Sequence, residues 1–141
     1  MFDHFVFNRN SKNMKYGYSK IVSLPFAEAV TKITEALATE GFGVLTTIDV
    51  KATMKKKLDL EYENYTILGA CNPTFAHQAL LAEKEIGLLL PCNVIVYQTG
   101  EEVHVSAMLP SAAMSAVEND AIAGVAQSVE EKLKKVVDTI L

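Results

Sequence analysis

The sequence lacks the features that mark several common classes of protein. It contains only two cysteines, Cys71 and Cys92, which are too few for a disulfide-stapled secreted domain and fit a reducing compartment. No stretch approaches the ~20 apolar residues that span a bilayer, and the first residues lack the basic and apolar regions of a secretory signal. We therefore expect a cytoplasmic protein with no membrane partner.

Positive charge is also scarce. Lys and Arg number 13 against 17 for Asp and Glu, so the formal net charge is −4. Such a chain offers no basic surface to a phosphate backbone, and we expect no nucleic-acid partner. The sequence contains no glycine-rich phosphate loop, HExxH, GxSxG or CxxC. It therefore lacks the motifs that usually indicate nucleotide binding, hydrolase activity or dithiol redox chemistry.

The composition indicates one ordered domain. Of the 141 residues, 50% are hydrophobic and 21% are charged, with no break along the chain. Regular patterning begins after Met14, so residues 1–14 are expected to be an N-terminal extension and residues 15–141 a single α+β domain. Three aromatic residues of the extension, Phe2, Phe5 and Phe7, could pack on the domain or on a neighbouring molecule.

Hydrophobic periodicity predicts strands and helices that follow one another along the chain. The expected strands are residues 16–23, 43–50, 65–71, 91–98 and 103–109, and the expected helices are 26–40, 51–57, 73–85 and 120–141. Asn72 is expected to cap the helix that begins at Pro73. The predicted fold is a two-layer α+β domain in which a curved, largely antiparallel sheet of order β-α-β-β-α-β-β-α is covered by the long C-terminal helix.

A hairpin turn at residues 99–102 sets the two faces of the last two strands. If Gln98 pairs with Val103, then Cys92, Val94 and Val96 face the core. The opposite face carries Tyr97, His104 and Ser106, which could line a secondary pocket or simply lie at the surface.

Several segments together resemble a known family. GFGVL and the strand ending in DV, then ILGACNP, GLLLPCNVIVY and a hairpin ending in MLP, are similar to the bacterial and archaeal domain of unknown function 302 family over roughly residues 15–141. The resemblance implies a fold related to the TATA-binding-protein-like group, but no established activity. It also implies that the strands ending at Cys71 and starting at Cys92 pair antiparallel, so that the two thiols would be neighbours.

The two cysteines are the centre of the predicted site. A helix start after Cys71 would favour a thiolate there, and the first hypothesis is a small-molecule or metal site in which five side chains converge: Asp49, Cys71, Asn72, His77 and Cys92. Two thiolates with an imidazole would suit zinc or another borderline-soft metal, with Cys71 and Cys92 as the core of the ligand set.

Other roles for these residues stay open from the sequence. Both cysteines could be small buried hydrophobic residues, and Asp49 could be an ordinary helix cap. A cysteine-dependent enzyme, by redox or thiol-nucleophile chemistry, is a second hypothesis. The third is a structural interaction domain that buries an open sheet face and the N-terminal extension in a homo-oligomer.

Overall fold

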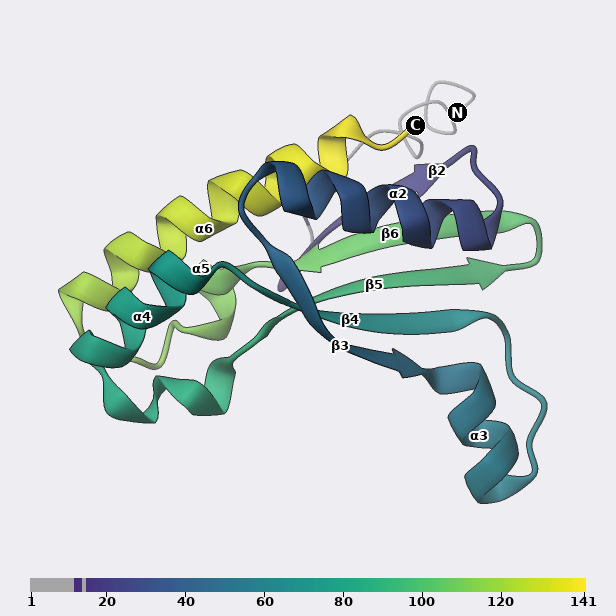
Figure 1. Ribbon diagram of the computed structural model, residues 1–141, viewed down its shortest axis with the longest axis horizontal. Helices are drawn as coiled ribbons and strands as arrows, with labels where there is room; N and C mark the ends of the chain where they lie inside the picture. The colour runs from purple at the N-terminus through teal and green to yellow at the C-terminus, as the bar shows by residue number, and fades with distance from the viewer. Residues whose placement is uncertain (1–11, 14) are drawn as a thin grey trace.

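A six-stranded antiparallel sheet forms the centre of the molecule. The computed structural model describes residues 12–13 and 15–141 (Figure 1). The strands lie in the order β1-β2-β6-β5-β4-β3, and every neighbouring pair is antiparallel. Their bounds are β1 (Lys12–Asn13), β2 (Gly17–Val22), β3 (Gly43–Asp49), β4 (Tyr65–Cys71), β5 (Cys92–Thr99) and β6 (Glu102–Met108).

The helices occupy the connections and the C-terminal end. They are α2 (Phe26–Thr39), α3 (Val50–Leu58), α4 (Pro73–Ala82), the 3-10 helix η1 (Lys84–Leu89), α5 (Pro110–Ala113) and α6 (Asp120–Thr139). The α+β class and the predicted order of elements are confirmed. The helix expected over 73–85 ends at Ala82 and continues as η1, and neither η1 nor α5 was predicted.

The predicted N-terminal extension lies mostly outside the described residues. Residues 1–11 and 14, which include Phe2, Phe5 and Phe7, are not described. Within the described part, Lys12 pairs with Ser19 and Asn13 with Tyr18, so two residues of the extension add a short edge strand to the sheet.

Helices α2 and α6 lie together on one face of the sheet (Figure 1). Their apolar residues recur at helical spacing, which gives each helix one face to bury. The buried set includes Ile33 and Leu37 of α2, Leu133 and Val136 of α6, and Val94, Val96 and Val105 of the sheet. The C-terminal helix therefore covers the sheet, as the sequence predicts, and α2 covers the same face beside it.

The β5–β6 hairpin has the predicted register. Gln98 pairs with Val103, and Cys92, Val94 and Val96 are buried on the helix-covered face. The opposite face carries no helix among the described residues (Figure 1). Its side chains, including Tyr97, His104 and Ser106, are only partly buried.

A second, smaller core lies beyond one end of the sheet. Residues of α4, η1 and the first half of α6, with the C-cap residue of α5, form it: Ala79, Ile86, Met114, Ile122 and Ala126. Asn119, the residue before α6, joins these elements because its side-chain amide donates to Ala82 O at 3.0 Å while its oxygen accepts from Ala121 N at 3.0 Å. Helix α6 therefore packs in both cores.

No helix in the described part of the chain has both the length and the apolar character needed to cross a bilayer.

Candidate functional site

Antiparallel pairing brings the two cysteines to the same end of the sheet. Strand β4 ends at Cys71, and β5 begins at Cys92, which pairs with Ala70. Cys71 therefore lies one residue further along β4 than Ala70, the partner of Cys92. Both are free thiols, with Cys71 half-buried and Cys92 buried. The proximity implied by the family resemblance is confirmed.

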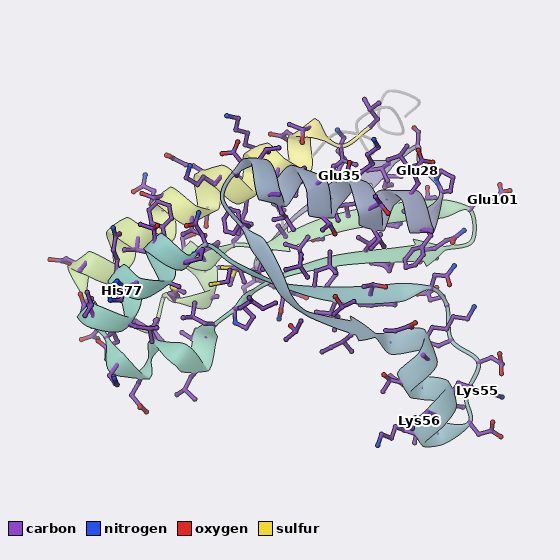
Figure 2. The ribbon with its side chains drawn as sticks, viewed as in Figure 1. Glu28, Glu35, Lys55, Lys56, His77 and Glu101 are labelled. Atoms are coloured by element: carbon purple, nitrogen blue, oxygen red, sulfur yellow. The ribbon has the colours of Figure 1, made fainter. Side chains whose placement is uncertain are left out.

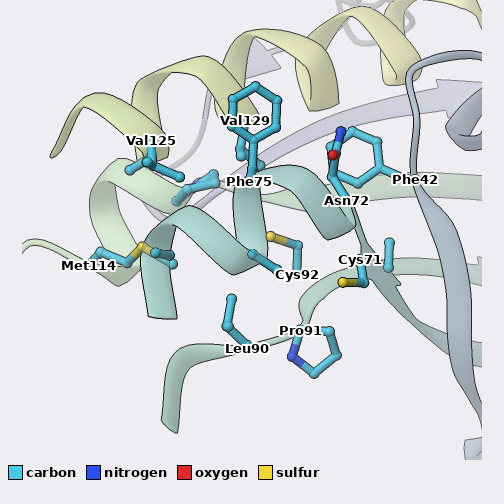
Figure 3. A pocket seen from close by; sticks show the side chains of 15 residues that line it. Phe42, Cys71, Asn72, Phe75, Leu90, Pro91, Cys92, Met114, Val125 and Val129 are labelled. Carbon is cyan, nitrogen blue, oxygen red and sulfur yellow. The ribbon is translucent and has the colours of Figure 1, made fainter. Parts of the chain in front are cut away.

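A narrow apolar cavity of about 30 Å³ lies beside both thiols. It is enclosed by the ends of β4 and β5, by α4 and by α6, between the larger and the smaller core (Figure 3). Besides Cys71 and Cys92, its lining includes Phe75 of α4, Met114, and Val129 of α6. A space of this volume admits a group about the size of one or two water molecules.

Burial sets the protonation state of Cys92. Removal of the thiol from water raises the pKa of Cys92 from 9.0 to about 11, and the nearby Cys71 contributes in the same direction. Both effects disfavour the thiolate. Cys92 is therefore a neutral thiol at neutral pH.

Asn72 has a different role from the predicted one. It occupies the N-cap position of α4, but its side chain makes no capping hydrogen bond there. Instead, Asn72 Nδ2 donates to the carbonyl oxygen of Glu40 at 3.2 Å, just after α2. The prediction that its side chain caps α4 is wrong, because the end of α2 offers an unsatisfied carbonyl at the same place.

The neighbouring turn explains why Asn72 can reach Glu40. Gly41 has φ +87°, and a Cβ atom there would lie 3.1 Å from Asn72 Nδ2. Gly41 N donates to Ala38 O and Phe42 N donates to Leu37 O, so α2 ends in a Schellman motif. The turn then places Phe42 on the wall of the cavity.

Asp49 does not join the cysteines. It pairs with Thr66, whereas Cys71 pairs with Gly43, so the two lie at opposite ends of the β3–β4 ladder, roughly 20 Å apart along the strand. Asp49 Oδ1 accepts a hydrogen bond from Ala52 N at 2.9 Å and caps α3. The cap interpretation is confirmed, and the predicted convergence of Asp49 with the cysteines is wrong.

His77 is also separate from the thiols. It is exposed on α4 and does not line the cavity (Figure 2). Residues 12–13 and 15–141 contain no cluster of three or more His, Cys, Asp or Glu side chains that could hold a metal ion. The predicted convergence is therefore wrong for His77 too, and only Cys71, Asn72 and Cys92 of the five predicted residues meet at the cavity.

The secondary pocket candidates lie on the open sheet face as predicted, but two of them contact each other. The rings of Tyr97 and His104 stack with centroids 4.5 Å apart, and Tyr65 stacks on Tyr97 at 5.4 Å. Ser106 Oγ lies 3.3 Å from Ser19 Oγ. The aromatic rings form a cross-strand stack that stabilises the sheet and fills the space between them.

Sequence reasoning missed most of the cavity wall. Phe42, Phe75, Met114, Val125 and Val129 come from four different elements or turns. Their sequence pattern was that of ordinary core residues, and no local signal shows that they surround one space. Only the two cysteines, at strand ends that pair, and the adjacent Asn72 pointed to this place.

Comparison with known proteins gives a family and a fold. The model of the family described as "Domain of unknown function DUF302" matches residues 18–140. A solved structure, "Crystal structure of uncharacterized conserved protein DUF302 from Bacillus stearothermophilus", is similar with a TM-score of 0.83 and 28% sequence identity. The match covers 89% of this chain and 98% of that chain. No curated protein matches.

Proposed function

Since the chain belongs to the DUF302 family, a domain of unknown function, we propose from its own geometry that it binds a small molecule in the cavity beside Cys71 and Cys92. One observation carries the proposal. Two thiols from different strands line the same apolar cavity, at the boundary between the two hydrophobic cores. Ligand sites of proteins are typically concave and apolar with a few polar groups, which this arrangement resembles.

The lining favours a small, uncharged and largely apolar ligand. The thiol of Cys92 is neutral at neutral pH, because its pKa is raised to about 11, and a thiol is only a weak hydrogen-bonding group. The cavity volume of about 30 Å³ is far below that of typical ligand pockets, which span about 300–1,000 Å³. Any ligand larger than one or two water molecules, benzene included, therefore enters only if α4 shifts away from α6, and the proposal includes this shift.

A soft metal ion is the second candidate. Met114 lines the same cavity as Cys71 and Cys92, so three sulfur atoms border it. Sulfur ligands suit Cu(I), whereas zinc normally takes four ligands. Because His77 and Asp49 lie elsewhere, only the two thiols remain of the zinc ligands expected from the sequence.

The cysteine-dependent enzyme is the weaker alternative. A thiolate is the reactive form of cysteine, and the raised pKa of Cys92 keeps it protonated at neutral pH. Any thiolate chemistry would therefore depend on Cys71, which is half-buried at the end of β4.

Thermal unfolding with benzene as a probe tests the small-molecule proposal. Ligand that binds only the folded state stabilises it, by about 2.7 kcal/mol at 100 times the Kd. We expect benzene to raise the Tm of the unmodified protein. The substitution Ala76→Leu, at a half-buried cavity position, should abolish this shift, whereas Leu81→Ala on the exposed side of α4 should preserve it.

Elemental analysis of the purified protein separates the two candidates. If the purified protein holds near-stoichiometric metal, and both Cys71→Ser and Cys92→Ser lose it, then the ligand of this site is a metal ion and not a small molecule. Protein that holds no metal and shows no benzene shift would contradict the proposed function. A benzene shift that survives Ala76→Leu would place binding elsewhere and contradict it as well.

A further inference from the structure

Exposed large hydrophobic residues are concentrated in one short part of the chain. We define the edge arm as residues 43–62, which comprise β3, α3 and the following loop. Half of the large hydrophobic residues that the described chain leaves exposed lie in this arm: Leu45, Ile48, Leu58, Leu60 and Tyr62. Exposed apolar residues concentrated in this way mark an interaction surface.

Helix α3 packs only loosely on its own chain, against β3 and β4. It has nine residues and buries none of them, and in Figure 1 it stands off the edge of the sheet. Isolated helices shorter than about 12–15 residues are marginal in water. Its Val50, Met54 and Leu58 form a stripe at helical spacing. Val50 and Met54 are half-buried within the chain, whereas Leu58 is exposed and open to a partner.

Strand β3 is an open edge of the sheet. It has β4 as its one neighbour in the described sheet, and six of its seven residues are exposed. Folded proteins usually block such an edge, since its unpaired backbone groups can pair with another strand. The bulge between Val44 and Thr46 interrupts the ladder to β4, but the strand continues for several residues beyond it.

We propose that the edge arm is a homodimer interface, in which β3 pairs antiparallel with β3 of a second copy. A two-fold axis makes an antiparallel strand complementary to itself, so each copy supplies the edge that the other lacks. Leu45 and Ile48 of one copy then approach the same residues of the other. This surface is distinct from the cysteine cavity, and the inference does not depend on the proposed function.

The distribution of charge agrees with a second copy as the occupant. Helix α3 carries four lysines and no acidic residue, although the whole chain has a net charge of −4. Lys55 forms ion pairs with Asp59 and Glu61 inside the arm at 2.9 Å each. Lys51, Lys56 and Lys57 form no ion pair among the described residues and extend from the arm into solvent; Figure 2 shows Lys56.

Antiparallel pairing brings these lysines onto the second copy. It sets the start of one β3 beside the end of the other, so α3 of one copy approaches the Gly43 end of its partner. The second copy carries a net charge of −4 and therefore attracts these lysines. A basic helix could also lie on an anionic membrane, but a membrane would leave the backbone edge of β3 unpaired.

Analytical ultracentrifugation of the full chain tests the interface. We expect the unmodified protein to be a dimer and the double variant Leu45→Lys with Leu58→Lys to dissociate at least about 10-fold more readily. The matched control is Leu81→Lys with Leu88→Lys, because these leucines are 75% and 82% exposed, compared with 68% and 62% for Leu45 and Leu58. The control should remain a dimer.

Hydrogen exchange on the unmodified protein gives a second measurement that needs no substitution. The β3 amides should exchange more slowly in a concentrated sample than in a dilute one, because pairing protects them. A monomer at all concentrations would overturn the proposal, as would a dimer that the Leu45 and Leu58 substitutions leave intact. A monomer that sediments with anionic phospholipid vesicles would also overturn it and assign the arm to a membrane surface.

Discussion

At the scale of single residues, the two cysteines show how far neighbouring positions can differ. Cys92 faces the helix-covered side of the sheet and is buried among valines, whereas Cys71 is the last residue of β4 and is half-buried. Burial leaves Cys92 as a small hydrophobic side chain with a neutral thiol. The two thiols share a cavity but should differ in reactivity and in their contribution to stability.

The first prediction concerns the pH dependence of stability at Cys92. Its pKa is raised from 9.0 to about 11 in the folded protein. The unfolded chain releases the thiol proton first, so stability that is complete below pH 9 is lost as the pH rises towards 11. The loss should be roughly 2 kcal/mol at pH 10.5. Substitution of Cys92 by alanine should remove this contribution to the pH dependence of stability.

Urea unfolding at pH 7.5 and pH 10.5 checks the prediction. The free energy of unfolding should fall more steeply with pH for the unmodified protein than for Cys92→Ala. The Cys71→Ala variant is the control and should retain most of the steep fall. Parallel pH profiles for the unmodified protein and Cys92→Ala would show that Cys92 titrates as it does in the unfolded chain.

At the scale of elements, the same local cap has different consequences in α3 and α6. Asp49 accepts from Ala52 N and Asn119 accepts from Ala121 N, each satisfying an amide of the first helical turn. Helix α3 buries none of its residues, but α6 buries six. The stability of α6 is therefore coupled to the whole fold, whereas that of α3 is coupled to it only weakly in a single chain.

The second prediction compares the two caps. Asp49→Ala should accelerate hydrogen exchange of the α3 amides while changing the free energy of global unfolding by less than about 0.5 kcal/mol. Asn119→Ala should lower the global value by about 1–2 kcal/mol, because it also removes the hydrogen bond to Ala82 O. The measurements should use dilute protein. A global loss above about 1 kcal/mol for Asp49→Ala would mean that α3 is stabilised by the rest of the fold.

At the scale of the whole molecule, α6 unites two cores. Ile122 and Ala126 pack in the smaller core, while Val129, Leu133 and Val136 pack in the larger one. A continuous helix that contributes to both makes it costly for either core to open alone. The cavity lies at the junction between the cores, where neither packs against the other completely.

The third prediction follows from this arrangement. Leu133→Ala should lower the free energy of unfolding by about 2–5 kcal/mol, because it leaves a space in the larger core. Leu81→Ala, at a residue 75% exposed, should change it by less than about 0.5 kcal/mol. Urea titrations followed by far-ultraviolet and tyrosine signals measure both. Separate transitions for the two signals would contradict a cooperative fold held together by α6.

Much of the fold follows from local patterns in the sequence. Periods of two and of about 3.6 residues placed the main strands and helices, and the short loop at residues 99–102 fixed the pairing of Gln98 with Val103. A cap at Asp49 was one of the two roles that the sequence left open for this residue. These features depend on residues a few positions apart, so their physics is present in the sequence alone.

The site depended on contacts between distant segments, which only the tertiary structure decided. Asn72 precedes a helix that it does not cap by its side chain, because folding brings the carbonyl of Glu40 within reach of its amide. The β3–β4 register placed Asp49 and Cys71 at opposite ends of one ladder. The sequence determined which residues form strands, helices and turns, whereas long-range packing decided which of their side chains meet, because those contacts join elements far apart in the chain.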